Sequence, residues 1–155
     1  MFRKMKDVGV PLSREETIQI FETQKHGTLA VNGDNGYPYA VPISFVYSND
    51  TIIFHSSITG HKLDAIKNDA KASFCVIDQD NIVPGEFNTL YRSAIAFGKA
   101  RILENDGEKR EALRQVLKKY SSDFMKSGEK YIDAELNNVA VIIIDIEHMT
   151  GKAGN

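Results

Sequence analysis

A period of two runs through residues 37–47 and constrains the fold more than any other feature of the chain. One side of this segment carries large apolar or aromatic side chains, which are Tyr39, Val41, Ile43, Phe45 and Tyr47. This pattern predicts a β-strand with one buried face. Turn-forming residues 33–36 and 48–50 flank the strand, and connections this short join antiparallel neighbours. Residues 28–32, 37–47 and 51–55 are therefore predicted to form an antiparallel meander.

Capping signals and helical spacing predict three helices. Ser13 and Glu16 have the spacing of a capping box, so the first helix is expected over residues 13–23. A short helix is expected over residues 62–67. Apolar residues recur at helical spacing over residues 108–125, which predicts the third helix.

Three further runs are predicted to be strands, at residues 71–78, 91–103 and 139–146. The last run is apolar through residue 144 and is expected to be buried on both faces. Residues 79–90 are polar and turn-rich and are expected to form a connection. About six strands and three helices indicate a mainly β protein. The predicted fold is an antiparallel Greek-key β-barrel with helices outside, in one domain over residues 1–155.

Composition narrows the classes of partner and compartment. The 19 basic and 21 acidic residues give a net charge of −2, so no general affinity for nucleic acid or an anionic membrane is expected. No segment approaches the roughly 20 apolar residues that span a bilayer, and the basic N-terminus lacks the apolar run of a secretory signal. The single cysteine, Cys75, is expected to be a small buried core residue. These features predict a cytoplasmic protein.

The residues most informative about chemistry are 54–62, with the sequence Phe-His-Ser-Ser-Ile-Thr-Gly-His-Lys. A predicted strand ends there, hydroxyl side chains follow at Ser56 and Ser57, and a helix opens beside Lys62. The N-terminus of a helix offers free backbone N–H groups and the positive end of a dipole, so this arrangement suits a phosphate. His61 would add another donor. The alternative is that Thr59 caps the helix and the lysine is solvated.

Two other segments suggest a ligand near the sheet. Pro42 lies in mid-strand, where it removes a ladder donor and favours an edge strand or a bulge. Backbone groups exposed there could meet a flat heteroaromatic ring, although an edge strand protected from aggregation explains the proline equally well. Gly98 lies within the strand predicted over residues 91–103 and indicates a bend or a close backbone approach.

The ordered set of motifs resembles the pyridoxamine 5′-phosphate oxidase-like FMN-binding split barrels, and within them the nitroimidazole-resistance reductase branch. The resemblance covers nearly the whole chain in family order. The matching pieces are Gly27-Thr28-Leu29-Ala30-Val31, Tyr37-Pro38-Tyr39-Ala40-Val41-Pro42-Ile43-Ser44, residues 54–62, Phe97-Gly98-Lys99-Ala100 and Met149-Thr150-Gly151-Lys152.

This resemblance implies a homodimer with FMN between its two subunits. The residues implied to line the isoalloxazine edge, largely through backbone groups, are Val41, Pro42, Ile43 and Ser44. Near the phosphate end, the resemblance implies His55 and Ser56, with Ser57 beside them. His61 replaces an arginine of the oxidases, and Lys62 matches their phosphate-binding lysine. Ser93 is implied to reach the flavin from the partner chain.

The resemblance also implies an oxidoreductase that passes electrons from a nicotinamide donor to a small acceptor such as a nitroaromatic. His55 is the one candidate proton donor, because no other catalytic acid or base is evident. True pyridoxamine phosphate oxidases end in an Arg-Leu-Ala-Pro-like segment. This sequence ends in Met149-Thr150-Gly151-Lys152-Ala153-Gly154-Asn155 instead, which argues against vitamin B6 oxidation.

Two other functions remain open from the sequence. A non-catalytic flavin-binding redox sensor or storage protein would use the same binding residues. A barrel that binds nucleic acid would need aromatic and basic residues interleaved along one groove, and the pair Tyr91-Arg92 is isolated. No metal site is predicted, because His26 and His148 lack partners at metal-ligand spacing. By analogy alone, Lys152 would approach the flavin or the dimer seam.

Overall fold

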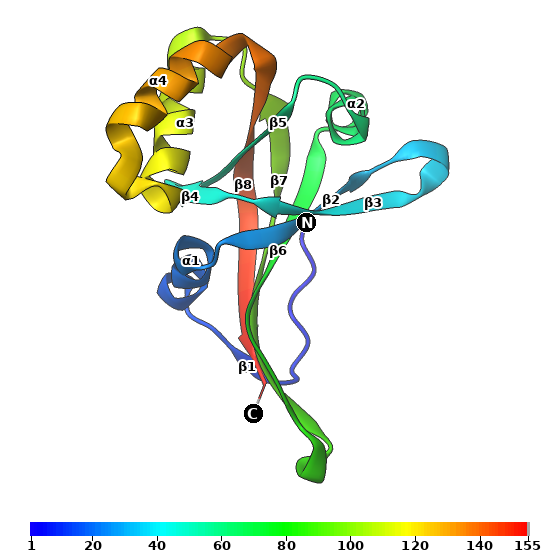
Figure 1. The fold of residues 1–155 in the computed structure, drawn as a ribbon. Coiled ribbons are helices and arrows are strands. Elements are labelled where there is room, and N and C mark those ends of the chain that lie inside the picture. The colour runs from blue at the N-terminus through cyan, green and yellow to red at the C-terminus, as the bar shows by residue number, and fades with distance from the viewer. Residues whose placement is uncertain (155) are drawn as a thin grey trace.

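A computed structural model describes residues 1–154 and contains one antiparallel sheet of eight strands with four α-helices. Figure 1 shows this sheet curling around a core, with α3 and α4 on one side. The strands are β1 Val10–Pro11, β2 His26–Asn32, β3 Pro38–Ser44, β4 Val46–Ser48, β5 Thr51–Ser57, β6 Lys71–Val83, β7 Asn88–Ile102 and β8 Val139–Ala153. The α-helices are α1 Arg14–Thr23, α2 His61–Asn68, α3 Asp106–Tyr120 and α4 Met125–Glu135. Four 3₁₀ turns are η1 Asp34–Gly36, η2 Pro84–Glu86, η3 Ser122–Phe124 and η4 Leu136–Asn138.

The sheet order is β3-β2-β6-β7-β8-β5-β4, with β1 paired to β8 off this path. Its two ends, β3 and β4, are consecutive in sequence and are separated only by Phe45. The chain itself therefore joins the two edges of the sheet, and the barrel is split where β3 turns away from β5. The single strand predicted over residues 37–47 is thus two strands, β3 before Phe45 and β4 after it, and each forms one edge of the sheet. The predicted split-barrel fold is confirmed.

The alternation predicted for residues 37–47 is confirmed, because its five large side chains all contact the barrel core. Ile43 and Phe45 are buried, while Tyr39, Val41 and Tyr47 pack against the core from its margin. Aromatic rings fill much of this space, and the Phe45 ring lies 4.8 Å from the Phe74 ring, centroid to centroid.

The predicted burial of β8 on both faces is confirmed by two separate apolar clusters. Ala140, Ile142 and Ile144 face the barrel core. Val141 is fully buried on the opposite face, in a cluster with residues of α3 and α4 such as Leu113 and Ile132. Because side chains alternate along a strand, a continuous apolar run is needed when both faces are covered.

The first helix begins as predicted, and the third does not end where predicted. Ser13 caps α1 in a capping box with Glu16. The helix predicted over residues 108–125 is wrong at its C-terminal end, because Ser121 leaves the helical conformation and α3 stops at Tyr120. The chain then reverses into α4, which the sequence did not predict. At Gly128 a Cβ atom would lie 2.7 Å from the Leu117 side chain, so the glycine allows α4 to pack closely on α3.

The predicted connection over residues 79–90 is wrong, because strands β6 and β7 continue through it as a two-stranded arm. Figure 1 shows this arm projecting away from the barrel. Ladder pairs extend from Gln79–Arg92 to Val83–Asn88, and η2 turns the chain at the tip. Phe87 at this tip is 97% exposed. A polar, solvent-facing ribbon lacks the one-sided burial that makes a strand visible in sequence.

Of the two predictions made for residues of the central strands, the one for Gly98 is confirmed and the one for Cys75 is wrong. At Gly98 a Cβ atom would lie 2.1 Å from the Asp145 carbonyl oxygen, and the β7–β8 register shifts there, so the predicted close approach is confirmed. The prediction for Cys75 is wrong, because it lies on the outer face of β6 and is only half-buried. Within residues 1–154, no helix combines the length and the apolarity that a membrane crossing requires.

Candidate functional site

The candidate site lies where β3 and β5 separate. β4 pairs with β5 from Ser48–Thr51 to Val46–Ile53, and a continued ladder would place Ser44 opposite His55. Instead β3 turns at Phe45 and pairs with β2 alone among the described strands. Both strand edges therefore present backbone N–H and C=O groups that no neighbouring strand pairs. The predicted residues 41–44 and 55–57 thus lie on the two edges of one split.

Side chains of β3 alternate between the core and the exterior. Val41 and Ile43 point into the barrel core, so only their backbone groups can meet a ligand at the strand edge. Pro42 and Ser44 are exposed. Pro42 lies on β3, the terminal strand of the sheet, and pairs in regular register with Thr28 of β2. This confirms the edge-strand alternative rather than a bulge.

The N-terminus of α2 has no side-chain cap. Its N-cap residue is Gly60, with φ +146° and ψ 171°, and no side chain bonds the first-turn N–H groups. The predicted alternative in which Thr59 caps this helix is therefore wrong. Uncapped N–H groups and the positive end of the helix dipole form a suitable environment for an anion.

Lys62 and two serines lie beside this helix start. Lys62 is half-buried, and within residues 1–154 it makes no ion pair. The Ser56 hydroxyl donates a hydrogen bond to the Ser57 carbonyl oxygen at 2.9 Å, so its proton is already engaged. The Ser57 side chain is exposed at the end of β5. Lys62 and Ser57 are thus the side chains of this group that are available to a phosphate.

His55 lies on β5 opposite Val141, so it shares the strand face of Ile53. Strand alternation directs Ser56 to the other face, with Phe54. The structure therefore does not bring His55 and Ser56 together on one face. His55 is exposed at the surface, yet neighbouring groups partly desolvate its ring and lower its pKa. A lowered pKa favours the neutral imidazole near pH 7.

His61 contacts residues of β3 and η1. Its ring lies 4.1 Å from the Tyr39 ring, centroid to centroid. The Asp34 backbone N–H donates to Nε2 of His61 at 3.4 Å, and a carboxylate oxygen of Asp34 lies 3.7 Å from the same nitrogen. The first residue of α2 is thereby tied to η1 and β3, which fixes the helix start relative to the strand edge.

These features have a family context. The sequence profile of the pyridoxamine 5′-phosphate oxidase family matches residues 13–153. The chain belongs to this family. No curated protein matches the chain.

Several solved structures share this fold. A candidate 5-nitroimidazole antibiotic resistance protein from Bacteroides thetaiotaomicron is 26% identical, with a TM-score of 0.81, over 99% of this chain and 90% of that one. An FAD-binding protein from Mesorhizobium loti is 19% identical, with a TM-score of 0.69, over 94% and 98%. An FAD- and haem-binding protein from Mycobacterium smegmatis is 24% identical, with a TM-score of 0.72, over 92% and 72%.

Ser93 does not join the other predicted residues of this family member within one chain. It lies on the outer face of β7, between Ile77 of β6 and Lys152 of β8. Strands β2 and β6 lie between β7 and β3, so Ser93 is three strands away from the edge of β3 within one chain, about 14 Å at 4.8 Å per strand. Lys152 lies next to Ser93 in the ladder and shares this placement.

Lys119 and Tyr120 lie at the point of separation and were not predicted as site residues. Both contact the backbone of Phe45, 74 and 75 residues earlier in the chain. Burial lowers the pKa of Lys119 to about 8. The sequence showed Tyr120 only as part of an apolar helix stripe, and no local signal connects either residue to the strand turn.

Two hollows lie away from the split. One of about 570 Å³ is on the outer face of the sheet, between the N-terminal residues Met1 and Phe2 and strands β2, β6 and β7. Another of about 300 Å³ lies between α1 and β8, lined in part by Leu12, Thr17 and Met149. Among residues 1–154, no three His, Cys, Asp or Glu side chains group closely enough to hold a metal ion.

Proposed function

We propose that this protein is an FMN-dependent oxidoreductase that passes electrons from a nicotinamide donor to a small acceptor such as a nitroaromatic. We further propose that it acts as a cytoplasmic homodimer. Membership in the pyridoxamine 5′-phosphate oxidase family supports a flavin cofactor. The relatives described as FAD-binding and as a candidate nitroimidazole resistance protein support the cofactor class and the acceptor class, respectively.

The observation that carries this proposal is the uncapped N-terminus of α2 beside Lys62. A phosphate monoester carries a charge of about −1.5 to −2 near pH 7. The helix end supplies about +0.5 and the lysine ammonium a full positive charge, so the two together nearly match it. Asp64 in the same turn is exposed, and solvent screens its opposing charge. The residues present therefore fit the terminal phosphate of FMN.

The chain's own residues would hold the cofactor and leave the redox chemistry to it. Bound flavin would supply that redox chemistry. The open edge of β3 over residues 41–44 would offer backbone donors and acceptors to the polar rim of the ring system. Lys62 and the first N–H groups of α2 would hold the phosphate, and Ser57 would add a hydroxyl. His55, neutral near pH 7, would accept or release a proton at a ring nitrogen.

The proposed homodimer completes the site. Strands β2 and β6 separate Ser93 on β7 from the edge of β3 in its own chain. In a dimer it would approach the flavin of the other subunit, with Lys152 beside it. Size measurement of the purified protein in solution tests this part of the proposal, and a flavin-loaded monomer would contradict it.

Substitution of Lys62 tests the phosphate site directly. Hydrogen bonds to charged groups contribute about 1.5–3 kcal/mol, so Lys62→Ala is expected to weaken FMN binding about 10- to 100-fold. Lys67→Ala is the matched control, because Lys67 is an exposed lysine in the last turn of the same helix. Unchanged FMN affinity in Lys62→Ala would remove Lys62 from the site. Chromatography of the extracted cofactor distinguishes FMN from FAD, and a predominance of FAD would replace the FMN assignment.

A non-catalytic flavin-binding redox sensor or storage protein is the second candidate function. It is favoured by the composition of the candidate site, where strand-edge backbone, hydroxyls and a lysine would bind a ligand and His55 is the one candidate proton donor. Steady-state oxidation of NADH or NADPH with nitroaromatic acceptors separates the two functions.

A further inference from the structure

We infer that Lys119 and Tyr120 are positioning residues that hold strands β3 and β5 apart, so that the flavin site between them stays open. This inference rests on the proposed function. Both residues end α3, far from the cofactor-binding residues in sequence, and both contact the single residue at which β3 and β4 separate.

Phe45 is the residue whose backbone needs partners other than a strand. It lies between the last residue of β3 and the first of β4, and its ring is fully buried. Its N–H donates to the Tyr120 hydroxyl at 3.0 Å, and its carbonyl oxygen lies 2.6 Å from the same hydroxyl. The Tyr120 hydroxyl also lies within hydrogen-bonding distance of the Lys25 carbonyl oxygen. The phenol oxygen therefore accepts from the Phe45 N–H, and its single proton is shared between the Phe45 and Lys25 carbonyl oxygens.

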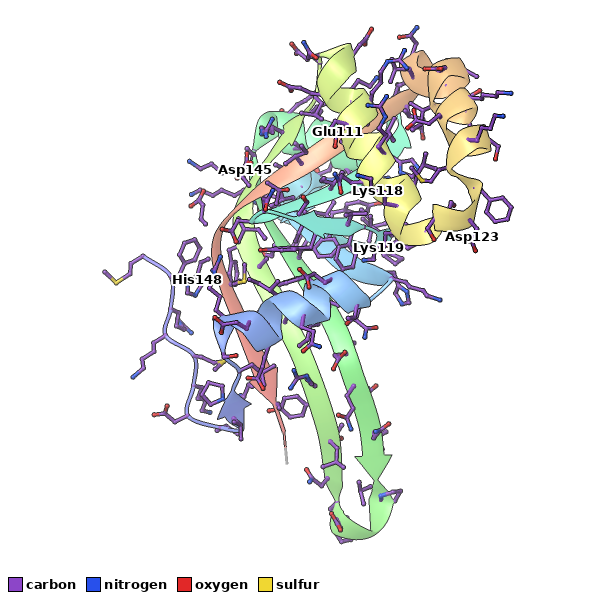
Figure 2. All side chains as sticks on the ribbon, turned by 90° about the vertical axis from the view of Figure 1, so that its left-hand side faces the viewer. Glu111, Lys118, Lys119, Asp123, Asp145 and His148 are labelled. Atoms are coloured by element: carbon purple, nitrogen blue, oxygen red, sulfur yellow. The ribbon has the colours of Figure 1, made fainter. Side chains whose placement is uncertain are left out.

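Lys119, the residue before Tyr120, also bonds the backbone of Phe45. Its ammonium nitrogen donates to the Phe45 carbonyl oxygen at 3.0 Å and to the Gln24 carbonyl oxygen at 2.5 Å. It also lies 4.1 Å from the centre of the Phe45 ring. Figure 2 shows Lys119 at the end of α3, beside the strands. The two side chains thus connect three segments, the end of α1, the β3–β4 turn and the end of α3.

The register shows what these contacts prevent. The β4–β5 ladder ends at Val46–Ile53, and its next rungs would be Phe45–Phe54 and Ser44–His55. Asn49 and Asp50 form a two-residue turn, so Ser48–Thr51 and Val46–Ile53 are hydrogen-bonded pairs, and Phe45–Phe54 would be a non-hydrogen-bonded pair. The N–H and C=O groups of Phe45 therefore face away from β5, and Tyr120 and Lys119 hold them from that side. These contacts anchor Phe45 to the end of α3, so that β3 leaves the ladder before Ser44 pairs with His55 and the edges of residues 41–44 and 55–57 stay free.

The experiment compares Tyr120→Phe and Lys119→Met with two matched controls. Tyr131→Phe removes a hydroxyl from an exposed tyrosine of α4, and Lys118→Met removes the neighbouring exposed lysine. FMN is titrated into each apo-protein, the visible spectrum of bound flavin is recorded, and amide exchange is followed at Phe45. We expect at least a tenfold weaker FMN affinity, a shifted flavin spectrum and altered Phe45 exchange in Tyr120→Phe. Lys119→Met should show the same changes to a smaller extent, and both controls should match the wild type.

The outcomes separate this inference from the proposed function. Folded Tyr120→Phe and Lys119→Met variants with wild-type affinity and spectrum would overturn the inference while leaving flavin binding intact. If the wild type binds no flavin, the proposed function fails, and amide exchange at Phe45 alone still tests the positioning role of Lys119 and Tyr120. Unchanged exchange in both variants would overturn that role. Lys119→Arg keeps a cationic donor at this position and should restore binding and spectrum. Failure of that rescue, with the fold retained, would also overturn the role of Lys119.

Discussion

Replacing Gly60 by alanine should damage the candidate phosphate site without any steric crowding. Gly60 has φ +146° and ψ 171°, a backbone conformation open in practice only to glycine. A Cβ atom placed there would meet nothing within 4 Å, so the whole cost comes from the backbone. Holding an alanine in such a conformation costs about 1–3 kcal/mol. Part of this strain lowers the stability of the fold, and part is relieved by moving the first N–H groups of α2 away from the split.

Gly85 provides the matched control for this substitution. A Cβ atom at Gly85 also meets nothing within 4 Å, but its φ is not in the left-handed region. Gly85→Ala should therefore leave the free energy of unfolding unchanged or raise it by about 0.4–1 kcal/mol, through reduced freedom of the unfolded chain. The two variants share the same chemical change and the same open surroundings, and they differ in backbone conformation.

Thermal unfolding and FMN titration of both variants test the reasoning. A loss of 1–3 kcal/mol in a chain of this size lowers Tm by about 2–12 °C. We expect this decrease for Gly60→Ala, together with at least a tenfold weaker FMN affinity. If Gly60→Ala behaves like Gly85→Ala in both measurements, the helix start does not depend on this conformation and the reasoning is refuted.

Three further substitutions test other parts of the structure. Gly98→Ala should lower the free energy of unfolding by about 3 kcal/mol or prevent folding, because its Cβ would overlap the Asp145 carbonyl oxygen at 2.1 Å; wild-type stability in chemical denaturation would contradict the close approach. Ser13→Ala should cost about 0.5–2 kcal/mol through loss of the α1 cap, and an unchanged denaturation midpoint would show that the capping box is dispensable. The pKa of Lys119 is lowered to about 8, so folding disfavours its protonated form. The stability of the wild type relative to Lys119→Met should thus rise by about 1 kcal/mol between pH 8 and 10.5, once solvent screening is allowed for, and a flat difference would refute this.

The sequence predicted correctly the elements whose signals come from neighbouring residues or from burial that is uniform along the element. The capping box at Ser13 depends on neighbouring residues alone, and it is present. The alternation around Ile43 and the continuous apolar run of β8 each reflect burial that is uniform along the strand, and both are confirmed. The projecting arm of residues 79–90 has no buried face, so its polar sequence resembles a loop although it pairs as strands.

The candidate site could be predicted only where its residues are local. The helix start after β5 lies within nine residues of sequence, so its position could be predicted, although the N-cap is Gly60 and not Thr59. The contacts that shape the split are not local: His61 contacts Asp34 across 27 residues, and Tyr120 contacts Phe45 across 75. A tyrosine on an amphipathic helix gives no sign of which distant peptide it will bond. Such contacts follow from the packed barrel and require its coordinates.

The most direct test of a phosphate site at the start of α2 compares FMN with riboflavin, which lacks the phosphate. The dissociation constants of both are measured by titration into the apo-protein, for the wild type and for Lys62→Ala. We predict that the wild type binds FMN at least tenfold more tightly than riboflavin and that Lys62→Ala loses most of this preference while keeping its riboflavin affinity. Equal affinities in the wild type, or a preference that survives Lys62→Ala, would contradict the site.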